Sequence, residues 1–279
     1  MATKIFTYDL DGTLFRIDNT VHPETQRMLL EAKKQNAINI ITTGRSYLRI
    51  LEVLKEVQGI DYCVCSNGNV IYNVATKEHY ILKKIDPQVF FLMREYGKKE
   101  KLSLNVDAVI FDGAIVPKEW YTEGLPKWIN DQHTFDLAEI WPKKEEDVLA
   151  VINNPKSEIV QLALRNPYDK SVETTEYIKA HLPKDCVVYW TNRIFTDVNP
   201  KGVSKYTGLK SLIDKLKIKN HKVYSFGDSS NDLEIIEHAD VGIAMGNATD
   251  DLKKAAKIVI GDHNSDTIGA TLKMLLSDF

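Results

Sequence analysis

The feature that most constrains the fold is a short apolar and aromatic run that ends in two aspartates. Ile5, Phe6 and Tyr8 are typical of a buried strand, and Asp9 and Asp11 come at its end. Because side chains alternate with a period of two along a strand, we expect both carboxylates to face one point. The glycine that follows permits a sharp turn, which suits a loop wrapped around an anion. The sequence therefore predicts a strand with paired acids at its carboxyl end.

These two carboxylates have alternative explanations. With no Lys or Arg beside them in the sequence, they repel each other unless one is protonated or a cation lies between them. A hard divalent cation such as Mg2+ prefers oxygen ligands and is the simplest resolution. The alternative is a strand end followed by an ordinary Asp-Gly turn. The rest of the chain has to decide between these interpretations.

Strands and helices alternate after this run, which indicates a parallel sheet with right-handed crossovers. In such sheets ligands bind beyond the carboxyl ends of the strands. Asp9, Thr43 and Asn67 each follow a predicted strand, so we expect them at one edge of the sheet. The elements expected here are a helix from Pro23, a strand at 37–42, a helix at 46–57 and a strand at 62–65.

The alternation of strands and helices becomes irregular near Leu82 and regular again near residue 195. Because 279 residues exceed the usual size of one core, we expect two domains. Residues 1–82 and 196–279 would form one domain, and residues 83–195 an inserted domain with its own sheet. A segment with three tryptophans among prolines and charges gives no clear pattern. Expected in the insert are helices at 86–99 and 169–182 and strands at 102–106, 159–164 and 187–190.

The last part of the chain resumes the alternation. We expect strands at 194–198, 223–226, 241–245 and 258–260, with helices ending near 216 and beginning near 249 and 265. The strand at 223–226 runs directly into residues 227–232, Gly-Asp-Ser-Ser-Asn-Asp. Asp228 thus also stands at a strand end, and we expect it near Asp9.

The residues at the first strand end carry a family resemblance. Residues 9–14, Asp-Leu-Asp-Gly-Thr-Leu, resemble the D-x-D-G-T-[LV] signature of the haloacid dehalogenase (HAD) superfamily of phosphatases. In that family the first aspartate is the nucleophile and the second is the general acid and base, which implies these roles for Asp9 and Asp11. Residues 43–45, Thr-Gly-Arg, are similar to the second HAD motif, whose hydroxyl binds the transferring phosphoryl group.

Two further stretches complete the resemblance. Residues 202–205, Gly-Val-Ser-Lys, resemble the third motif of the Cof-type branch (subfamily IIB), where the lysine neutralises the nucleophile and the phosphate. Residues 227–232 match the fourth motif, G-D-x-x-N-D. Each stretch also has an ordinary explanation: a loop for Thr43, a solvated charge for Lys205, a helix cap for Asp228 or Ser229. All four in order at strand ends favour the family.

The resemblance implies a fold and a set of site residues. The fold is a doubly wound parallel, Rossmann-like α/β core with an inserted α/β cap of the C2 type. The implied cofactor is Mg2+. The implied metal ligands are Asp9, Asp11 through its backbone carbonyl, Asp228 and Ser229. The implied phosphate-binding groups are the amides of Leu10 and Gly44 with Thr43, Lys205 and Asn231, while Asp232 anchors a metal-bound water and Arg45 and Asn67 are possible substrate contacts.

The implied function is Mg2+-dependent hydrolysis of a small phosphorylated metabolite through an aspartyl-phosphate. The alternatives are a phosphohexose mutase similar to phosphomannomutases and a non-catalytic sensor of phosphorylated metabolites. The resemblance covers only the two core segments, so the substrate stays open among sugar phosphates, pyridoxal phosphate and flavin mononucleotide. Arg165 and Arg193 are possible substrate contacts from the inserted domain.

Composition narrows the partners and the compartment. A net charge of -3 argues against nucleic acid, because proteins that bind the phosphate backbone are usually strongly basic. An odd count of three cysteines without a C-x-x-C pair favours reduced thiols, and we interpret Cys63 and Cys65 as strand core. No apolar run is long enough to span a bilayer, and no signal peptide precedes the first strand. We therefore expect a cytoplasmic protein that does not act at a membrane.

Overall fold

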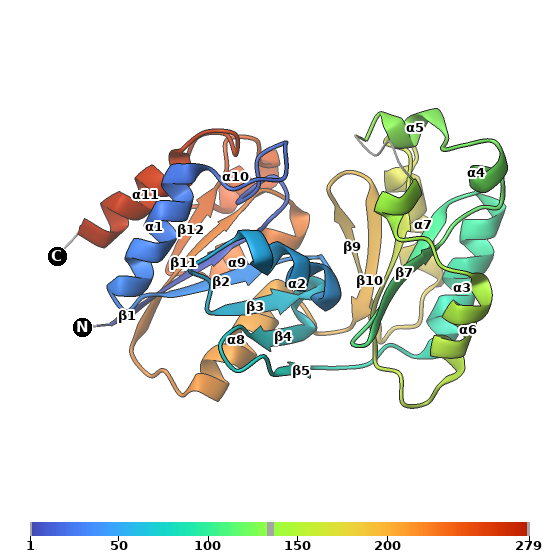
Figure 1. The fold of residues 1–279 in the computed structure, drawn as a ribbon, viewed down its shortest axis with the longest axis horizontal. Helices are drawn as coiled ribbons and strands as arrows, with labels where there is room; N and C mark the ends of the chain where they lie inside the picture. Colours follow the sequence, from blue (N-terminus) through green and yellow to red (C-terminus); the bar gives the residue numbers. More distant parts are fainter. Residues whose placement is uncertain (1, 133–136, 278–279) are drawn as a thin grey trace. The chain divides into compact units, whose positions relative to one another are not determined.

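The chain forms two compact units in the computed structural model, which describes residues 2–132 and 137–277. The first unit combines Met1–Leu82 with Ser204–Phe279, and the second unit is Lys83–Val203. Each unit has its own sheet (Figure 1).

An eight-stranded sheet forms the centre of the first unit, in the order β13-β12-β11-β1-β2-β3-β4-β5. Neighbouring strands from β13 to β3 are parallel, and β4 and β5 extend the sheet in antiparallel pairing. The chain proceeds from β1 toward β3 and later from β11 toward β13, so the order reverses at β1. The strands are β1 (Thr3–Tyr8), β2 (Ile38–Thr42), β3 (Tyr62–Cys65), β4 (Val70–Asn73), β5 (His79–Ile81), β11 (His221–Gly227), β12 (Val241–Ala244) and β13 (Ile258–Val259).

Helices lie on both faces of this sheet (Figure 1). Right-handed crossovers that proceed in opposite directions from β1 place their helices on opposite faces. Thus α1 packs against α11, while α8, α9 and α10 form a second group of neighbouring helices. The helices are α1 (Pro23–Lys34), α2 (Tyr47–Glu56), α8 (Lys205–Leu216), α9 (Leu233–His238), α10 (Asp250–Ala255) and α11 (Thr267–Ser277), with short 3-10 turns η1 (Ser66–Gly68) and η3 (Ser230–Asp232).

Capping residues explain where the helices beside the sheet edge begin. Ser46 accepts a hydrogen bond from the backbone N–H of Arg49 at 3.2 Å and starts α2. Ser204 accepts from the backbone N–H of Thr207 at 3.1 Å, and the Thr207 hydroxyl accepts from the Ser204 N–H at 2.8 Å. This reciprocal cap fixes Lys205 as the first residue of α8.

The core of the first unit is built on β1, as its apolar run predicted. Phe6 and Tyr8 are completely buried, and their rings stack on Tyr224 and Phe226 of the neighbouring strand β11 with centroids 5.1 and 5.3 Å apart. Cross-strand aromatic pairs of this kind stabilise a sheet beyond their buried area. The two strands that carry Asp9 and Asp228 are therefore held in fixed register.

The second unit has a five-stranded antiparallel sheet in the order β7-β6-β8-β10-β9. Apolar residues of its strands pack with helices α3, α6 and α7 in one core cluster that includes Phe90, Leu162 and Ile178. The strands are β6 (Ser103–Ala108), β7 (Phe111–Ile115), β8 (Ile159–Arg165), β9 (Cys186–Thr191) and β10 (Phe195–Pro200). The helices are α3 (Pro87–Lys99), α4 (Glu119–Thr122), α5 (Lys127–Asn130), α6 (Glu145–Asn153) and α7 (Ser171–His181), with a 3-10 turn η2 (Leu137–Ile140).

The boundary of the second unit differs from the prediction. The unit extends to Val203 instead of ending at residue 195, because β10 pairs with β8 and β9 and so belongs to the antiparallel sheet. The segment with three tryptophans folds as α4, α5 and η2, with Trp120 and Trp128 in edge contact at 5.7 Å. Residues 133–136 of that segment lie outside the described residues.

Cys63 and Cys65 lie in the core of a strand, as predicted. Neither forms a disulfide, and both are buried in β3, where burial raises the pKa of the Cys63 thiol. Cys186 likewise forms no disulfide and is partly buried in β9. Among the helices described within residues 2–132 and 137–277, none is long and apolar enough to cross a membrane.

Candidate active site

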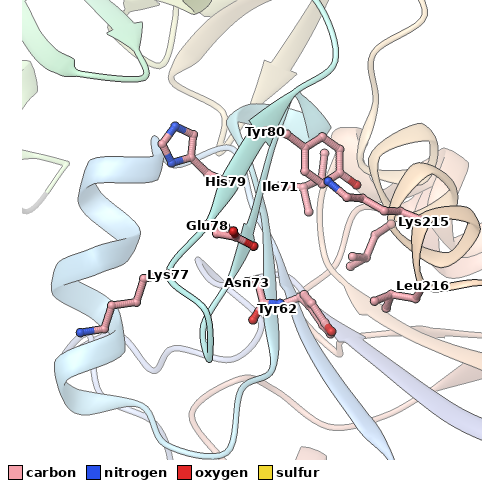
Figure 2. A pocket seen from close by; sticks show the side chains of 10 residues that line it. Tyr62, Ile71, Asn73, Lys77, Glu78, His79, Tyr80, Lys215 and Leu216 are labelled. Atoms are coloured by element: carbon pink, nitrogen blue, oxygen red, sulfur yellow. The ribbon is translucent and has the colours of Figure 1, made fainter.

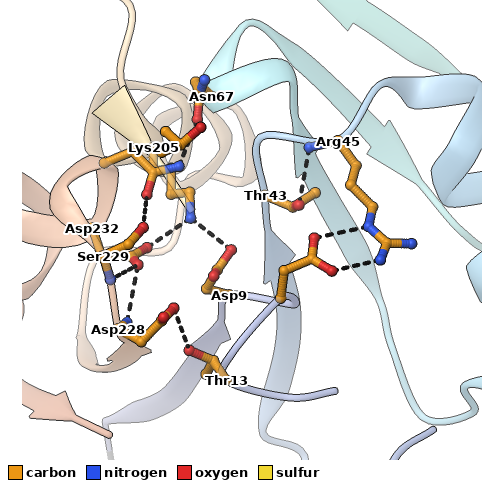
Figure 3. A network of polar contacts seen from close by, with 12 residues as sticks. Asp9, Thr13, Thr43, Arg45, Asn67, Lys205, Asp228, Ser229 and Asp232 are labelled. Carbon is orange, nitrogen blue, oxygen red and sulfur yellow. Dashed lines mark hydrogen bonds and ion pairs between the residues drawn. The ribbon is translucent and has the colours of Figure 1, made fainter. Parts of the chain in front are cut away.

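The carboxyl ends of four neighbouring parallel strands bring the predicted site residues together. Asp9 follows β1, Thr43 follows β2, Asn67 follows β3 and Asp228 follows β11. Since the strand order reverses at β1, Asp9 stands at the topological switch point, where open α/β sheets bind ligands. Figure 3 shows these side chains pointing into one region.

A buried lysine holds the centre of this region. The Nζ atom of Lys205 donates to Oδ1 of Asp9 and to Oδ1 of Asp232, both at 2.7 Å (Figure 3). The side chains of Lys205 and Asp232 are completely buried, and that of Asp9 is 7% exposed. Such a buried charge requires close partners of opposite sign. The reciprocal cap of α8 supplies the position of this lysine.

Asp228 completes the acidic part of the site. Its Oδ1 accepts a hydrogen bond from the Thr13 hydroxyl at 3.2 Å. A Cβ atom at position 12 would lie 2.5 Å from Oδ2 of Asp228, so only glycine leaves room for this carboxylate. The backbone N–H groups of Asp228 and Ser229 both donate to Oδ2 of Asp232 at 3.1 Å, which fixes the loop after β11.

Asp9, Asp228 and Asp232 form an acidic cluster whose composition fits a divalent cation. One carboxylate oxygen from each lies within 4.8 Å of the others. Three carboxylates face the single ammonium group of Lys205, so the cluster has an excess of negative charge, and all its donor atoms are hard oxygens.

The electrostatics of the cluster follow from its burial. Burial raises the pKa of Asp9 to about 7, although Lys205 opposes the shift and Asp232 and Asp11 add to it. Burial and the charge of Asp9 raise the pKa of Asp228 well above its usual value. For Lys205, burial acts to lower the pKa, but the charges of Asp232 and Asp9 outweigh it and raise the pKa. The cluster thus gains from a cation that stabilises its ionised carboxylates.

The side chain of Asp11 is held by an arginine at the same site. Strand β1 ends at Tyr8, so Asp11 lies in the turn after the strand and the period of two no longer applies. Its two oxygens accept hydrogen bonds from Arg45, from Nε at 2.9 Å and from Nη2 at 2.5 Å. The guanidinium of Arg45 also lies 5.2 Å from the ring of Phe15. Arg45 therefore contacts the predicted acid and base directly.

The remaining predicted residues line the same strand ends. Leu10 is completely buried in the turn after β1, and Gly44 lies in the turn after β2. The hydroxyl of Thr43 accepts from the backbone N–H of Arg45 at 3.0 Å. In the loop after β11, the Ser229 hydroxyl donates to Oδ1 of Asn231 at 2.6 Å, and Nδ2 of Asn231 donates to Oδ1 of Asn67 at 2.8 Å.

Two residues at the site were not predicted. Thr13 lies inside the first motif, but its hydrogen bond to Asp228 is visible only in three dimensions. Asn247 donates from Nδ2 to the carbonyl of Gly12 at 2.8 Å, which ties the turn after β12 to the turn after β1. The signal for Asn247 was the Gly-Asn turn that follows the strand at 241–245. In both cases the partner lies more than two hundred positions away in the chain.

The two arginines predicted as contacts in the second unit have different surroundings. Arg165 is buried in β8, donates from Nε to Oε1 of Gln132 at 2.8 Å and lies over the ring of Phe195 at 5.7 Å. Arg193 is exposed in the turn between β9 and β10. Arg165 has a fixed position in its unit, whereas Arg193 is a surface residue.

A cavity of about 510 Å3 lies in the first unit beside β4, β5 and α8 (Figure 2). Its lining includes Tyr62 at the amino end of β3, together with Tyr80 and Lys215, whose ammonium lies 3.7 Å from the Tyr80 ring centroid. It shares no residue with the acidic cluster. The cavity is thus distinct from the candidate active site.

Comparisons with known proteins agree with the geometry. Residues 6–272 match the family model of haloacid dehalogenase-like hydrolases. The chain is 26% identical over 279 residues to the pyridoxal phosphate phosphatase YbhA of Escherichia coli K12, covering 96% of this chain and 97% of that protein. It is 23% identical over 272 residues to the 5-amino-6-(5-phospho-D-ribitylamino)uracil phosphatase YcsE of Bacillus subtilis 168, covering 97% and 94%.

Solved structures support the same fold. A haloacid dehalogenase-like hydrolase from Bacteroides thetaiotaomicron superposes with a TM-score of 0.78 at 20% identity, covering 99% of this chain and 100% of that one. A HAD subclass IIB sugar phosphatase also gives 0.78, at 24% identity and 98% coverage of both chains. The predicted α/β fold and the predicted hydrolase of phosphoric monoesters are confirmed. The chain belongs to the haloacid dehalogenase-like hydrolases.

Proposed function

We propose that this protein is a Mg2+-dependent phosphatase that hydrolyses a small phosphorylated metabolite through an aspartyl-phosphate intermediate. The observation that carries the proposal is the buried Lys205 held between Asp9 and Asp232, next to Asp228, at the carboxyl ends of parallel strands. This arrangement places one ammonium and a cation site around a single carboxylate. It is suited to a nucleophile that attacks a dianionic phosphoryl group.

Each side chain has a role in this proposal. Asp9 attacks the phosphorus atom, and Lys205 offsets the negative charge of both Asp9 and the incoming phosphoryl group. Mg2+ would be held by Asp9, Asp228 and the backbone carbonyl of Asp11, with Asp232 and Ser229 beside it, and would supply further positive charge to the phosphoryl oxygens. Thr43, Asn231 and the amides of Leu10 and Gly44 would donate to those oxygens. The chain's own side chains and amides would thus do most of the positioning of the phosphoryl group.

Asp11 is the proposed acid and base. It would protonate the leaving oxygen and then accept a proton from the water that hydrolyses the aspartyl-phosphate. Its carboxylate is held by two hydrogen bonds from Arg45, so the pair has to loosen before Asp11 can reach a leaving group. In this proposal Arg45 holds Asp11 in place until the ester binds. Arg45 would then also contact the bound anion.

The second unit is proposed to select the leaving group. The residues named above recognise only the phosphoryl group and the metal, which all phosphate esters share, so they cannot distinguish one ester from another. Lys83–Val203 is the large remaining part of the chain. The relatives named as a pyridoxal phosphate phosphatase and a ribitylaminouracil phosphatase support a small metabolite as substrate.

The test is phosphate release from a panel of phosphorylated metabolites and a small aryl phosphate, with and without Mg2+. We expect hydrolysis that requires Mg2+ and that Ca2+ supports poorly, because the looser coordination shell of Ca2+ relaxes the in-line geometry. Phosphate moved between hydroxyls with little release would indicate a mutase instead. Binding without turnover of any ester would indicate a sensor, and full activity after exhaustive chelation would exclude the metal-dependent mechanism.

The raised pKa of Asp9 predicts how stability depends on pH. In the unfolded chain Asp9 has its usual pKa of 3.8, and in the folded metal-free protein the pKa is about 7. The folded state therefore binds the proton more tightly, so this contribution to stability is present at low pH and is lost as the pH rises through about 7. We expect a higher Tm at about pH 6 than at about pH 8 without metal, by differential scanning calorimetry. Asp9→Asn should reduce this difference, and an unchanged difference would place its origin elsewhere.

A further inference from the structure

Asn67 lies in a strained turn directly after β3. Ser66, Asn67 and Gly68 have φ values of 51, 53 and 106°, and all three residues are buried. A positive φ is costly for a residue with a Cβ atom, and such strain persists only where surrounding contacts enforce it. Here the backbone N–H groups of Ser66 and Asn67 donate to the carbonyls of Arg45 and Thr43 at 2.9 and 3.0 Å. The turn is thereby tied to the loop after β2.

The same turn also packs against the start of α8. A Cβ atom at position 68 would overlap the backbone carbonyl of Ser204, the residue before Lys205. A Cβ atom at position 208 would lie 2.6 Å from the carbonyl oxygen of Gly68. Two glycines thus allow the backbones to approach closely. The strained turn therefore joins the Thr43 loop to the helix that carries Lys205.

The side chain of Asn67 extends from this strained turn to the loop after β11. Its Oδ1 accepts a hydrogen bond from Nδ2 of Asn231 at 2.8 Å, while Oδ1 of Asn231 accepts from the Ser229 hydroxyl at 2.6 Å. With its oxygen and one amide hydrogen engaged, the amide plane of Asn231 has a single orientation. The second hydrogen on Nδ2 is then fixed in direction.

We propose that Asn67 is a positioning residue: it orients Asn231 so that the second amide hydrogen of Asn231 is directed at a phosphoryl oxygen. This rests on the proposed function and replaces the expectation that Asn67 itself contacts substrate. The strain at position 67 fits this role, because the residue held in the left-handed conformation is the one whose side-chain oxygen accepts from Asn231.

Two substitutions at position 67 distinguish the effect of losing the side-chain amide from the effect of the backbone strain. Asn67→Gly keeps the left-handed conformation without cost and removes the oxygen acceptor, whereas Asn67→Ala removes the acceptor and keeps the strain. Isothermal titration calorimetry with inorganic phosphate in the presence of Mg2+ is the readout, because it needs no turnover. We expect both variants to bind phosphate roughly tenfold more weakly, with Asn67→Gly the more thermally stable of the two.

The matched control is Asn36→Gly, at an exposed left-handed residue with φ 59° after α1. It makes the same exchange in the same backbone conformation and should bind phosphate as the wild type does. Combination with Asn231→Ala gives the decisive comparison. If Asn67 acts through Asn231, then Asn67→Gly adds no further loss in the Asn231→Ala background.

Two results would overturn the role of Asn67. One is wild-type phosphate affinity in Asn67→Gly, and the other is a double variant whose loss equals the product of the two single losses. Failure of the proposed function is a separate result: the wild-type protein would bind phosphate with Mg2+ but release none from any ester. Affinity and turnover thus report on different claims.

Discussion

Asp9→Asn is expected to abolish turnover of every phosphate ester, with a loss in kcat of about 10⁴-fold or more. An amide has the shape of the carboxylate but is a poor nucleophile, so no aspartyl-phosphate forms. The fold should persist, because the substitution replaces a buried carboxyl group whose pKa is already raised to about 7. Phosphate release from an aryl phosphate measures the loss, and calorimetry verifies the fold.

The matched control for this variant is Asp18→Asn, at an exposed aspartate in the same N-terminal segment. It removes the same charge outside the cluster and should leave kcat within about twofold of the wild type. Turnover in Asp9→Asn comparable to that of this control would require another nucleophile, and the proposed mechanism would be wrong.

Lys205→Met is expected to lose both stability and activity. Met has a similar length without the ammonium, so Asp9 and Asp232 are left buried without the cation that each contacts at 2.7 Å. Breaking a buried ion pair by removing one partner costs about 3–5 kcal/mol, and losing a charge that stabilises the transition state costs about 10²–10³ in kcat. Urea unfolding and aryl phosphate hydrolysis measure the two effects.

The pH and the metal should modulate this loss of stability in a defined direction. Protonated carboxylates need no counter-charge, so the variant should be closest to the wild type at about pH 6 and least stable at about pH 8. Mg2+ should recover part of the stability at the higher pH, since it supplies positive charge to the same carboxylates. Lys210→Met, at an exposed position on the same helix, is the control and should change stability by less than about 0.5 kcal/mol. Wild-type stability of Lys205→Met at about pH 8 would contradict the charge argument.

The sequence predicted the parallel part of the fold well because its strands are continuous apolar runs between helices with clear caps. The strand at Tyr62–Cys65 has the predicted bounds, and β1 ends directly before Asp9. The short antiparallel strands β4 and β5 were missed because they carry little periodicity of their own. The end of the second unit was placed too early because β10 resembles a core strand in composition, and only its pairing with β8 and β9 assigns it to the other sheet.

The residues that belong to the candidate site were easier to predict than the contacts between them. Motifs at the carboxyl ends of parallel strands identified Asp9 and Asp228, and the third motif identified Lys205 at the start of α8. The pairs Lys205 with Asp232, Arg45 with Asp11 and Asn231 with Asn67 depend on helix starts, turn conformation and sheet order together. None of these pairs follows from local periodicity.

The most direct test of the central claim, that Asp9 is the nucleophile, is to trap the phosphorylated residue. Asp11→Asn should accumulate the intermediate from an aryl phosphate, because the phenolate leaves without a proton while the base for hydrolysis is missing. After acid quench, borohydride reduces an aspartyl-phosphate to homoserine, which peptide mass mapping locates. The account predicts homoserine at position 9 in a Mg2+-dependent reaction. Aryl phosphate cleavage with position 9 recovered only as aspartate, or homoserine at another position, would contradict it.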